Sequence, residues 1–471
     1  MNNKIRNFIE RLSIVLWAQI YSMLISGVTA FIMPKYFSIQ AYSYYQLENL
    51  YCGYIWIISL GIPNGFFLKY GGKKRGEFNK SEITSQVAVY TMYIVLISIL
   101  LIVTALIFGK DASKKFVFIL SVIITAHEII FNMLAYIMQA SNSMKQYMRG
   151  VILLRTLSLI FLITGILFHV KNFKFLIAQD LISKIMVNAI MVFSLRDVLF
   201  GRIWNISYNL KKLIEMFQIG ISIYLSSYAN SCIKIMIQNL VENVWGLLVF
   251  GKIALCFSIS SLFTKLVSAA GLVLYSSLRK AEAEKQSRFY NALNSLIPII
   301  MLFLFCFYFP AVIALKKILP SYADSLKFMA VLLPGCIYEV KTVFLINTYL
   351  QIIHREKEIL YSNIVSVGFC LCLSGLTAYV FHELVLVVGA VSIAMGFRCW
   401  YEERRLLAYV KETETRNSGL WVILSVFVFC SWFLKNVSGV ALYALTLLLY
   451  IVLKKEEIRK AIESIYRIGK R

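Results

Sequence analysis

Charged residues are scarce in this sequence. Only 15% of its 471 residues are Asp, Glu, Lys or Arg, and 59% are hydrophobic. A soluble globular chain carries about 25% charged and roughly 45–50% apolar residues. The composition therefore excludes a soluble globular enzyme.

The residues that carry metal and phosphate chemistry are also few or unsuitably spaced. The four histidines are scattered, and the nine cysteines lie almost entirely within apolar runs, as is typical of small buried side chains. No phosphate-binding loop of the Walker type is present, and Gly71-Gly72 is a basic turn that lacks the motif. We therefore expect no metal, no cofactor and no ATP hydrolysis.

Long apolar runs, in contrast, are abundant. A helix needs about 20 apolar residues to cross a bilayer. The sequence holds fourteen runs of 17 residues or more, at about 12–34, 47–68, 87–108, 116–140, 151–169, 176–194, 218–237, 246–276, 292–313, 325–350, 359–380, 385–401, 418–434 and 439–453. It predicts an all-α polytopic membrane protein with about 14 transmembrane helices.

The distribution of lysine and arginine predicts the orientation. Of 48 basic residues, 32 lie on the side of the N-terminus, nine on the other side and seven within the spans. Because cytoplasmic segments are enriched in Lys and Arg, we expect both termini in the cytoplasm and the chain in the cell membrane. The net charge of +24 thus reflects Lys and Arg in the cytoplasmic segments of a membrane protein, and we expect no nucleic-acid partner.

Basic connections also suggest a repeat. They follow the sixth and twelfth spans, which predicts a six-helix lobe over 1–200, a second over 201–410, and a helix pair with a basic tail over 411–471. Transporters built from such repeats bind substrate between the halves. The tail, 454–471, has isoleucines spaced among basic residues. It fits an amphipathic helix on the anionic leaflet or ordinary positive-inside anchoring.

Seven basic residues lie inside the predicted spans, where each charge is costly, and Arg398 at the end of the twelfth span is assigned to the basic connection 398–416. They are Arg155, Lys184, Lys234, Lys252, Lys265, Lys327 and Lys341. Lys234, Lys252 and Lys327 lie near span ends, where the side chain reaches the headgroups. The substrate-binding candidates are Arg155, Lys184, Lys265 and Lys341.

These candidates differ in their neighbours. Asp180 precedes Lys184 by four residues, so an ion pair within the helix competes there with a substrate contact. Glu339 and Lys341 are two residues apart and face different ways, and Lys265 has no acidic neighbour within a turn. Lys265 and Lys341 are therefore the strongest candidates for lining a polar cavity.

Four acidic residues lie within the spans, namely Glu48, Glu128, Asp180 and Glu339. The basic residues outnumber them, which favours an anionic substrate such as a phosphate. The acidic residues are candidates for coupling transport to a proton or Na⁺ gradient. Glu128, beside His127, is the most central of them, and an interhelical partner is an equally good interpretation.

Three segments carry a family resemblance. The stretch 42–76 resembles the second-helix region of bacterial oligosaccharide flippases, which export lipid-linked O-antigen or capsule repeat units and belong to the multidrug/oligosaccharidyl-lipid/polysaccharide superfamily. The stretch 320–366 is similar to part of the second lobe, and 271–282 to the end of the eighth helix. Two departures are Gln351, where members often have Lys, and Tyr275-Ser276-Ser277, which lacks a common proline.

The resemblance implies a function. It implies two six-helix lobes around a cationic cavity, alternating access, and an undecaprenyl-pyrophosphate-linked glycan as substrate. A polysaccharide polymerase and chain-length machinery would be partners. The alternatives are a multidrug or lipid II exporter of the same superfamily and, from another class, a membrane polysaccharide polymerase or glycosyltransferase. The short outer connections argue against the enzyme.

Overall fold

The computed structural model describes residues 3–73, 75–203, 206–278, 283–353, 355–409, 419–434 and 436–469. Throughout these ranges the regular structure is helical, which confirms the all-α polytopic fold. Each of the fourteen predicted spans falls on one helix or on a broken series of helices. By length and composition, nine helices of the described chain qualify as membrane spans, or up to eleven when bent pairs are joined.

The described residues divide into two compact units. Unit 1 comprises those up to Ile235 together with Trp245–Gly251, and unit 2 comprises Met236–Val244 and those from Lys252 onward. The domain limits at 200 and 410 stay predictions.

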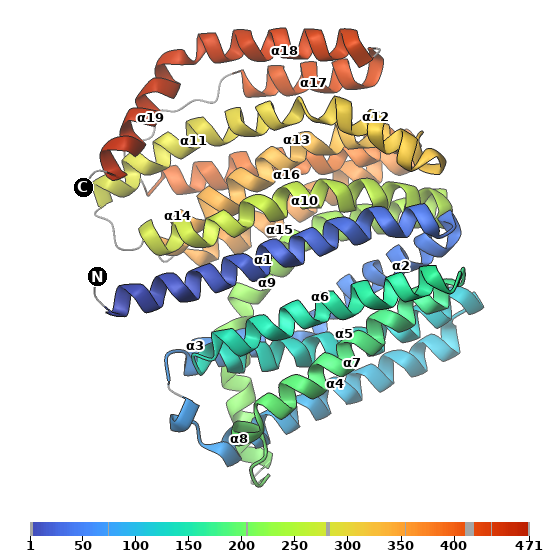
Figure 1. The fold of residues 1–471 in the computed structure, drawn as a ribbon, viewed down its shortest axis with the longest axis vertical. Coiled ribbons are helices and arrows are strands. Elements are labelled where there is room, and N and C mark those ends of the chain that lie inside the picture. Colours follow the sequence, from blue (N-terminus) through green and yellow to red (C-terminus); the bar gives the residue numbers. More distant parts are fainter. Residues whose placement is uncertain are drawn as a thin grey trace. The chain divides into compact units, whose positions relative to one another are not determined.

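Unit 1 is a bundle built mainly of long helices. Its elements are α1 (Asn3–Tyr36), α2 (Ile39–Ile55), η1 (Trp56–Ser59), α3 (Ile62–Tyr70), η2 (Arg75–Glu77), α4 (Lys80–Phe108), α5 (Ala112–Ala140), α6 (Met144–Leu167), α7 (Phe173–Ser194), α8 (Arg196–Leu199) and the first part of α9 (Ile206–Trp245). Helices α4, α5, α6 and α7 lie side by side, and α1 packs on α6 (Figure 1).

Polar caps begin several of these helices. The side chain of Asn79 accepts a hydrogen bond from the Glu82 N–H at the start of α4, and Asp111 accepts from the first turn of α5. Such caps satisfy N–H groups that have no partner within the helix. The turns between the spans are therefore encoded locally.

The second predicted span, 47–68, is broken in the structure. Leu60 and Gly61 both have left-handed backbone conformations, with φ of 51° and 69°. Pro63 follows in the first turn of α3. The segments before and after the break meet at 51°. A hydropathy pattern cannot reveal this bend, because the residues on both sides of it are apolar.

Arg75 joins several segments at the predicted cytoplasmic end of unit 1. From η2, its guanidinium donates hydrogen bonds to both carboxylate oxygens of Asp197 in α8. It also donates to the Gln146 Oε1 atom, 2.7 Å away, and to the Ser194 carbonyl. One side chain thus connects the loop before α4 with the ends of α6 and α7.

Unit 2 is built around one enclosed broken helix. Its elements are the larger part of α10 (Leu247–Leu278), α11 (Ala283–Phe305), α12 (Tyr308–Ile318), α13 (Met329–Val340), the π-helical η5 (Lys341–Ile346), α14 (Asn347–Ile352), α15 (Glu356–Tyr379), α16 (Leu384–Leu407), α17 (Leu420–Phe433), α18 (Asn436–Leu453) and α19 (Lys455–Gly469). In the stretch Leu326–Ile352, 83% of the most apolar window is buried, against 11% for α4, which identifies the former as core and the latter as a peripheral helix.

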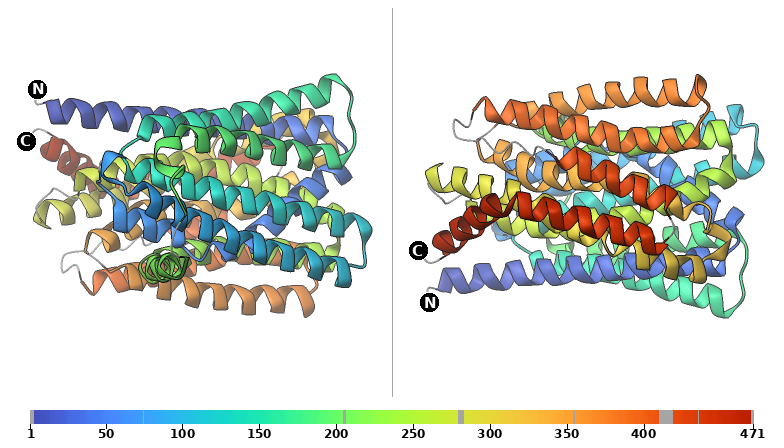
Figure 2. Two further views of the ribbon diagram at one scale, coloured as in Figure 1. Left: turned by 90° about the horizontal axis from the view of Figure 1, so that it is seen from below. Right: turned by 90° about the horizontal axis from the view of Figure 1, so that it is seen from above.

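The predicted C-terminal tail forms helix α19. It bends away from α18 by 65°. The right view of Figure 2 shows α19 as the darkest red helix, next to the C-terminus. Helix α19 packs against α11 and buries Ala461, while Ile462 is exposed. The tail is therefore anchored on unit 2 along one face.

Candidate functional site

Lys184 is the centre of a charged cluster in unit 1. Its Nζ atom lies 2.8 Å from Asp180 Oδ2 on the same helix, α7, and 3.4 Å from Glu128 Oε2 on α5. The ammonium group is largely buried, with 12% of its side chain exposed. The helical ion pair that the spacing allows is thus formed, and a second helix adds a further carboxylate.

A third carboxyl group belongs to the same cluster. Glu48 on α2 is 2% exposed and interacts electrostatically with Asp180, Lys184 and Glu128. Its Oε1 atom accepts a hydrogen bond from the Cys52 thiol, with a sulfur–oxygen distance of 3.1 Å. Its Oε2 atom has no hydrogen-bond partner in the part of the chain that the structure describes. Three acidic groups from three helices therefore surround one lysine.

A second cluster lies in unit 2 around Lys341, the first residue of the π-helical segment. The Lys341 Nζ atom lies 2.8 Å from both carboxylate oxygens of Glu403 on α16. The Oε1 atom of Glu403 also accepts a hydrogen bond from Asn294 Nδ2 on α11, at 3.2 Å. Segments of π-helix often occur at functional sites, because they change the direction in which a side chain leaves the helix.

Helix α16 carries a further buried ion pair. We assign Arg398 to a basic connection from sequence, but in the structure α16 continues past it to Leu407 and the residue is 1% exposed. Its Nε atom donates to Glu402 Oε1, 3.0 Å away and one helical turn further on. Sequence reasoning misses Arg398 as a buried residue, because it lies near the end of the predicted twelfth span, 385–401, and is grouped there with the basic connection that follows.

Three predicted residues remain, and the structure shows a hydrogen bond of one of them. Arg155 on α6 is exposed and donates a hydrogen bond to the Ser22 hydroxyl of α1, at 3.1 Å. Glu339 lies half-buried on α13. Lys265 falls within α10, but its side chain lies outside the described residues.

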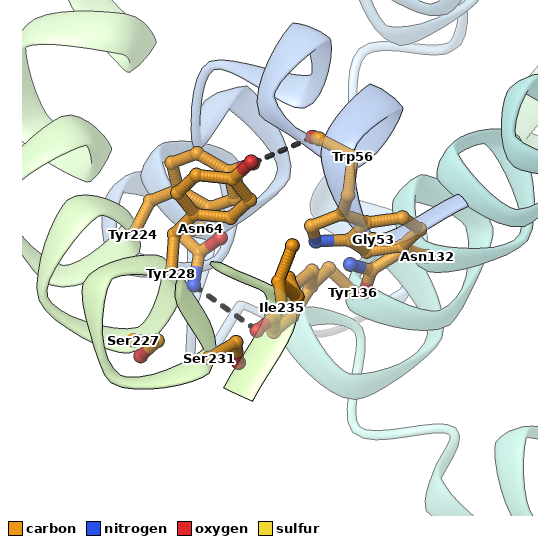
Figure 3. A pocket seen from close by; sticks show the side chains of 10 residues that line it. All are labelled: Gly53, Trp56, Asn64, Asn132, Tyr136, Tyr224, Ser227, Tyr228, Ser231 and Ile235. Atoms are coloured by element: carbon orange, nitrogen blue, oxygen red, sulfur yellow. Dashed lines mark hydrogen bonds between the residues drawn. The ribbon is translucent and has the colours of Figure 1, made fainter. Parts of the chain in front are cut away.

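Unit 1 also contains a cavity of about 330 Å³ at the break in the second span (Figure 3). It is lined by Gly53, Trp56, Asn64, Asn132, Tyr136, Tyr224, Ser227, Tyr228, Ser231 and Ile235. These residues come from α2, η1, α3, α5 and α9. None of them is charged, and aromatic rings, amides and hydroxyl groups predominate.

Tyrosines of α9 bind carbonyl groups that the break exposes. The Tyr224 hydroxyl donates to the Trp56 carbonyl at 2.6 Å, and the Tyr228 hydroxyl donates to the Tyr54 carbonyl at 3.2 Å. The two tyrosine rings stack at a centroid distance of 5.9 Å. Asn64 Nδ2 of α3 donates a hydrogen bond to the Tyr136 hydroxyl of α5 at 3.2 Å, as Figure 3 shows.

Glycines allow α9 to approach the broken helix closely. A Cβ atom at Gly220 would collide with the carbonyl oxygen of Gly61, and one at Gly65 would collide with the Met216 carbonyl. Glycine is therefore required at these positions by backbone contact. The contact also fixes the distance at which Tyr224 and Tyr228 meet the carbonyls of the break.

Sequence reasoning missed this cavity. Its one visible signal is Gly61-Ile62-Pro63-Asn64-Gly65 within an apolar run, since glycine and proline mark a break. The partner residues on α9 carry no comparable signal, because Tyr224 and Tyr228 read as ordinary apolar helix positions.

Solved structures of membrane transporters are similar to this chain. The lipid II flippase MurJ, in an inward closed conformation, aligns with a TM-score of 0.69 at 12% sequence identity, over 96% of this chain and 100% of that one. A multidrug resistance MATE family transporter of the MOP superfamily, in an inward-facing conformation, aligns with a TM-score of 0.61 at 12% identity, over 86% of this chain and 99% of the other. The chain has the fold of these transporters.

The comparisons by sequence are negative. No protein-family model matches the chain, and no curated protein matches it. The structural likeness and the apolar helices together establish a multi-pass membrane protein of the MurJ and MATE fold. Within the described residues, no group of three or more His, Cys, Asp and Glu is arranged to hold a metal ion.

Proposed function

We propose that the chain is a flippase for lipid-linked glycans. It would move undecaprenyl-pyrophosphate-linked oligosaccharide repeat units from the cytoplasmic to the outer leaflet, for surface polysaccharide such as O-antigen, capsule or exopolysaccharide. The observation that carries the proposal is the fold of the lipid II flippase MurJ over 96% of this chain. The resemblance of 42–76 and 320–366 to oligosaccharide flippases supports the surface-polysaccharide branch.

In this proposal, basic residues bind the pyrophosphate. Arg155, Lys184, Lys265 and Lys341 are the proposed contacts to the pyrophosphate or the glycan, and Lys265 and Lys341 are the strongest candidates among them. Both Lys184 and Lys341 are held by carboxylates in the present state. A pyrophosphate diester carries two negative charges against one for a carboxylate, and it competes for the same ammonium donors. Substrate binding would thus exchange one partner for the other.

The same exchange offers a means of coupling. When the phosphate binds the ammonium group of Lys184, the carboxylates of Asp180 and Glu128 lose their positive partner. Buried carboxylates without a positive partner bind a cation or a proton. We propose Glu48, Glu128, Asp180 and Glu339 as the ion-coupling residues. The Glu48 Oε2 atom, buried without a hydrogen bond among the described residues, is suited to receive a proton.

The setting of this flippase would be the cell membrane, with both termini in the cytoplasm as the distribution of Lys and Arg indicates. A polysaccharide polymerase and chain-length machinery would use the exported units at the outer face.

The deciding experiment compares lipid-linked oligosaccharides in cells with and without this protein. We expect repeat units to accumulate on the cytoplasmic side and surface polysaccharide to be lost without it. Complete units exposed on the outer side but left unpolymerised would contradict translocation and identify a polymerase. Complementation with Lys265→Gln, Lys341→Gln and the double variant tests the sites, and normal export by all three would refute their assignment.

A second candidate function is export of organic cations. It is favoured by the three carboxyl groups around Lys184 and by the likeness to a MATE family transporter. A cation exporter would protect cells from cationic drugs and leave the lipid-linked oligosaccharides unchanged. Export of lipid II, the other alternative within the superfamily, would instead show as a defect in the cell wall.

A further inference from the structure

We propose that the cavity at the break of the second span is a subsite for one uncharged sugar residue of the transported glycan. This inference rests on the proposed function, and it adds a binding site to it that the charged residues alone do not indicate. The subsite lies entirely within unit 1, between the broken helix, α5 and the first part of α9.

The lining has the chemistry that a pyranose ring requires. One face of such a ring is a patch of C–H groups, which packs on aromatic side chains, and its edge carries hydroxyl groups that both donate and accept hydrogen bonds. The cavity offers the rings of Trp56, Tyr136 and Tyr228 beside the amides of Asn64 and Asn132. Because no lining residue is charged, the site favours a neutral sugar over a phosphate or an acidic one.

Several of the aromatic rings are held in place before any ligand arrives. Tyr224 and Tyr228 are fixed by hydrogen bonds to backbone carbonyls of the broken helix, and Tyr136 is fixed by Asn64. A preorganised site loses less conformational entropy when it binds. These contacts therefore make rigid walls of side chains that would otherwise rotate freely.

Other polar groups of the lining remain available to a ligand. The Asn132 amide, the Ser231 hydroxyl and the Trp56 indole N–H line the cavity and make no hydrogen bond within the described chain. They supply donors as well as acceptors, as sugar hydroxyl groups require. The volume of about 330 Å³ lies near the lower end of the roughly 300–1,000 Å³ of small-molecule sites, which suits a single sugar better than a whole oligosaccharide.

The position of the cavity relative to the charged cluster strengthens the proposal. Glu128 and Asn132 lie four residues apart on α5, so they occupy the same face on successive turns, about 6 Å apart along the axis. In a pyrophosphate-linked glycan, the first sugar is bonded directly to the phosphate. A pyrophosphate at Lys184 would therefore place a proximal sugar beside Asn132.

The test is binding of free neutral disaccharides to the full-length protein in lipid nanodiscs. Lactose and N,N′-diacetylchitobiose serve as probes, observed by saturation-transfer NMR in all variants and also by tryptophan fluorescence in those that keep Trp56. We expect both Asn132→Leu and Trp56→Phe to weaken binding by about fivefold to tenfold, the value of one or two hydrogen bonds. Trp56→Phe keeps an aromatic ring, so it still reports if Asn132→Leu fails to fold.

Two control variants match these substitutions. Trp400→Phe changes an exposed tryptophan of α16 in unit 2, and Asn49→Leu changes an exposed asparagine of α2 outside the cavity lining. Both should bind the probes as the unmodified protein does. Equal weakening by the controls, or unchanged binding in Asn132→Leu and Trp56→Phe, would overturn the subsite.

A cationic probe separates the sugar site from its closest rival, because aromatic rings also bind organic cations. One result would overturn the proposal and favour a cation exporter. In it, the unmodified protein binds tetraphenylphosphonium but no disaccharide, and Asn132→Leu and Trp56→Phe both weaken the binding of tetraphenylphosphonium. The comparison of lipid-linked oligosaccharides is independent of these measurements. Sugar binding without a flipping defect would contradict the flippase, and a flipping defect without sugar binding would contradict only the subsite.

Discussion

The ammonium nitrogen of Lys341 lies 2.8 Å from both carboxylate oxygens of Glu403. The two residues are 62 positions apart in the chain, and the lysine side chain is 4% exposed. Lys341 begins the π-helical segment η5, whose hydrogen-bonding pattern interrupts the otherwise α-helical core of unit 2. A lysine that sequence identifies as a cavity residue is thus already neutralised in this state.

Removal of one partner of this pair should be costly. We expect Lys341→Met to lower the free energy of unfolding by about 3–5 kcal/mol, because Glu403 is left as a largely buried charge without its cation. The double variant Lys341→Met/Glu403→Leu should recover most of the loss. Thermal unfolding of the purified protein measures both.

An export assay on the same variants distinguishes a structural role of the Lys341–Glu403 pair from a role in binding substrate. If Lys341 binds the pyrophosphate, the stable double variant will still fail to export repeat units. Export restored by the double variant would contradict a substrate role for Lys341 and leave it a purely structural one.

The cluster around Lys184 should respond unequally to its members. Lys184→Met leaves Asp180, Glu128 and Glu48 without a cation, whereas Asp180→Asn leaves Lys184 with Glu128 at 3.4 Å. We therefore expect the larger fall in unfolding temperature from Lys184→Met. Lys171→Met, at an exposed lysine just before α7, should change little. Equal effects of Lys184→Met and Lys171→Met would contradict the cluster.

The glycine contact between α9 and the broken helix should tolerate no side chain. Gly220→Ala places a methyl group against the Gly61 carbonyl, so we expect a loss of roughly 1–3 kcal/mol, typical of overpacking, and a distorted cavity. Gly375→Ala in α15 is the matched control, because beyond its own helical turn no atom lies within 4 Å of its added Cβ. It should be neutral or stabilise the helix by about 0.5–1 kcal/mol.

Protease resistance and disaccharide binding measure these two glycine variants together. Gly220→Ala should reduce both quantities, and Gly375→Ala should reduce neither. A Gly220→Ala protein as resistant as the unmodified one would show that the α9 contact does not hold unit 1 together.

The pair of Arg75 and Asp197 should make stability depend on pH. The hydrogen bond from Arg75 lowers the pKa of Asp197 below its usual value of 3.8. The pair therefore stabilises the folded protein above about pH 3.8, and this stabilisation is lost as pH falls through the lowered pKa. Because Asp197 is half exposed, we expect Asp197→Asn to cost only about 0.5 kcal/mol or less at neutral pH.

The measurement is thermal unfolding of the unmodified protein and of Asp197→Asn between neutral and acid pH. Their difference should shrink below about pH 3.8 and also in 1 M salt, which screens exposed charges. A difference that persists under both conditions would show that Asp197 acts through packing rather than through its charge.

The local sequence determines the membrane spans and many of their ends. Apolar runs of this length are stable only in a bilayer, and residues such as Asn79 and Asp111 cap helices through contacts with their own first turn. The ion pair of Asp180 with Lys184 is equally local, since four residues separate its members. Each of these features depends on neighbours within one or two helical turns.

The tertiary structure decided which distant residues meet. Glu403 became the partner of Lys341, Glu128 joined Lys184 across 56 residues, and Tyr224 reached the Trp56 carbonyl across 168. These contacts depend on how each helix is rotated and where the second span breaks. In a largely apolar helix the pattern of residues does not specify that rotation, because every face is compatible with lipid or with protein. The rotation is selected by the packing of whole helices, through contacts such as that of Gly220 with Gly61.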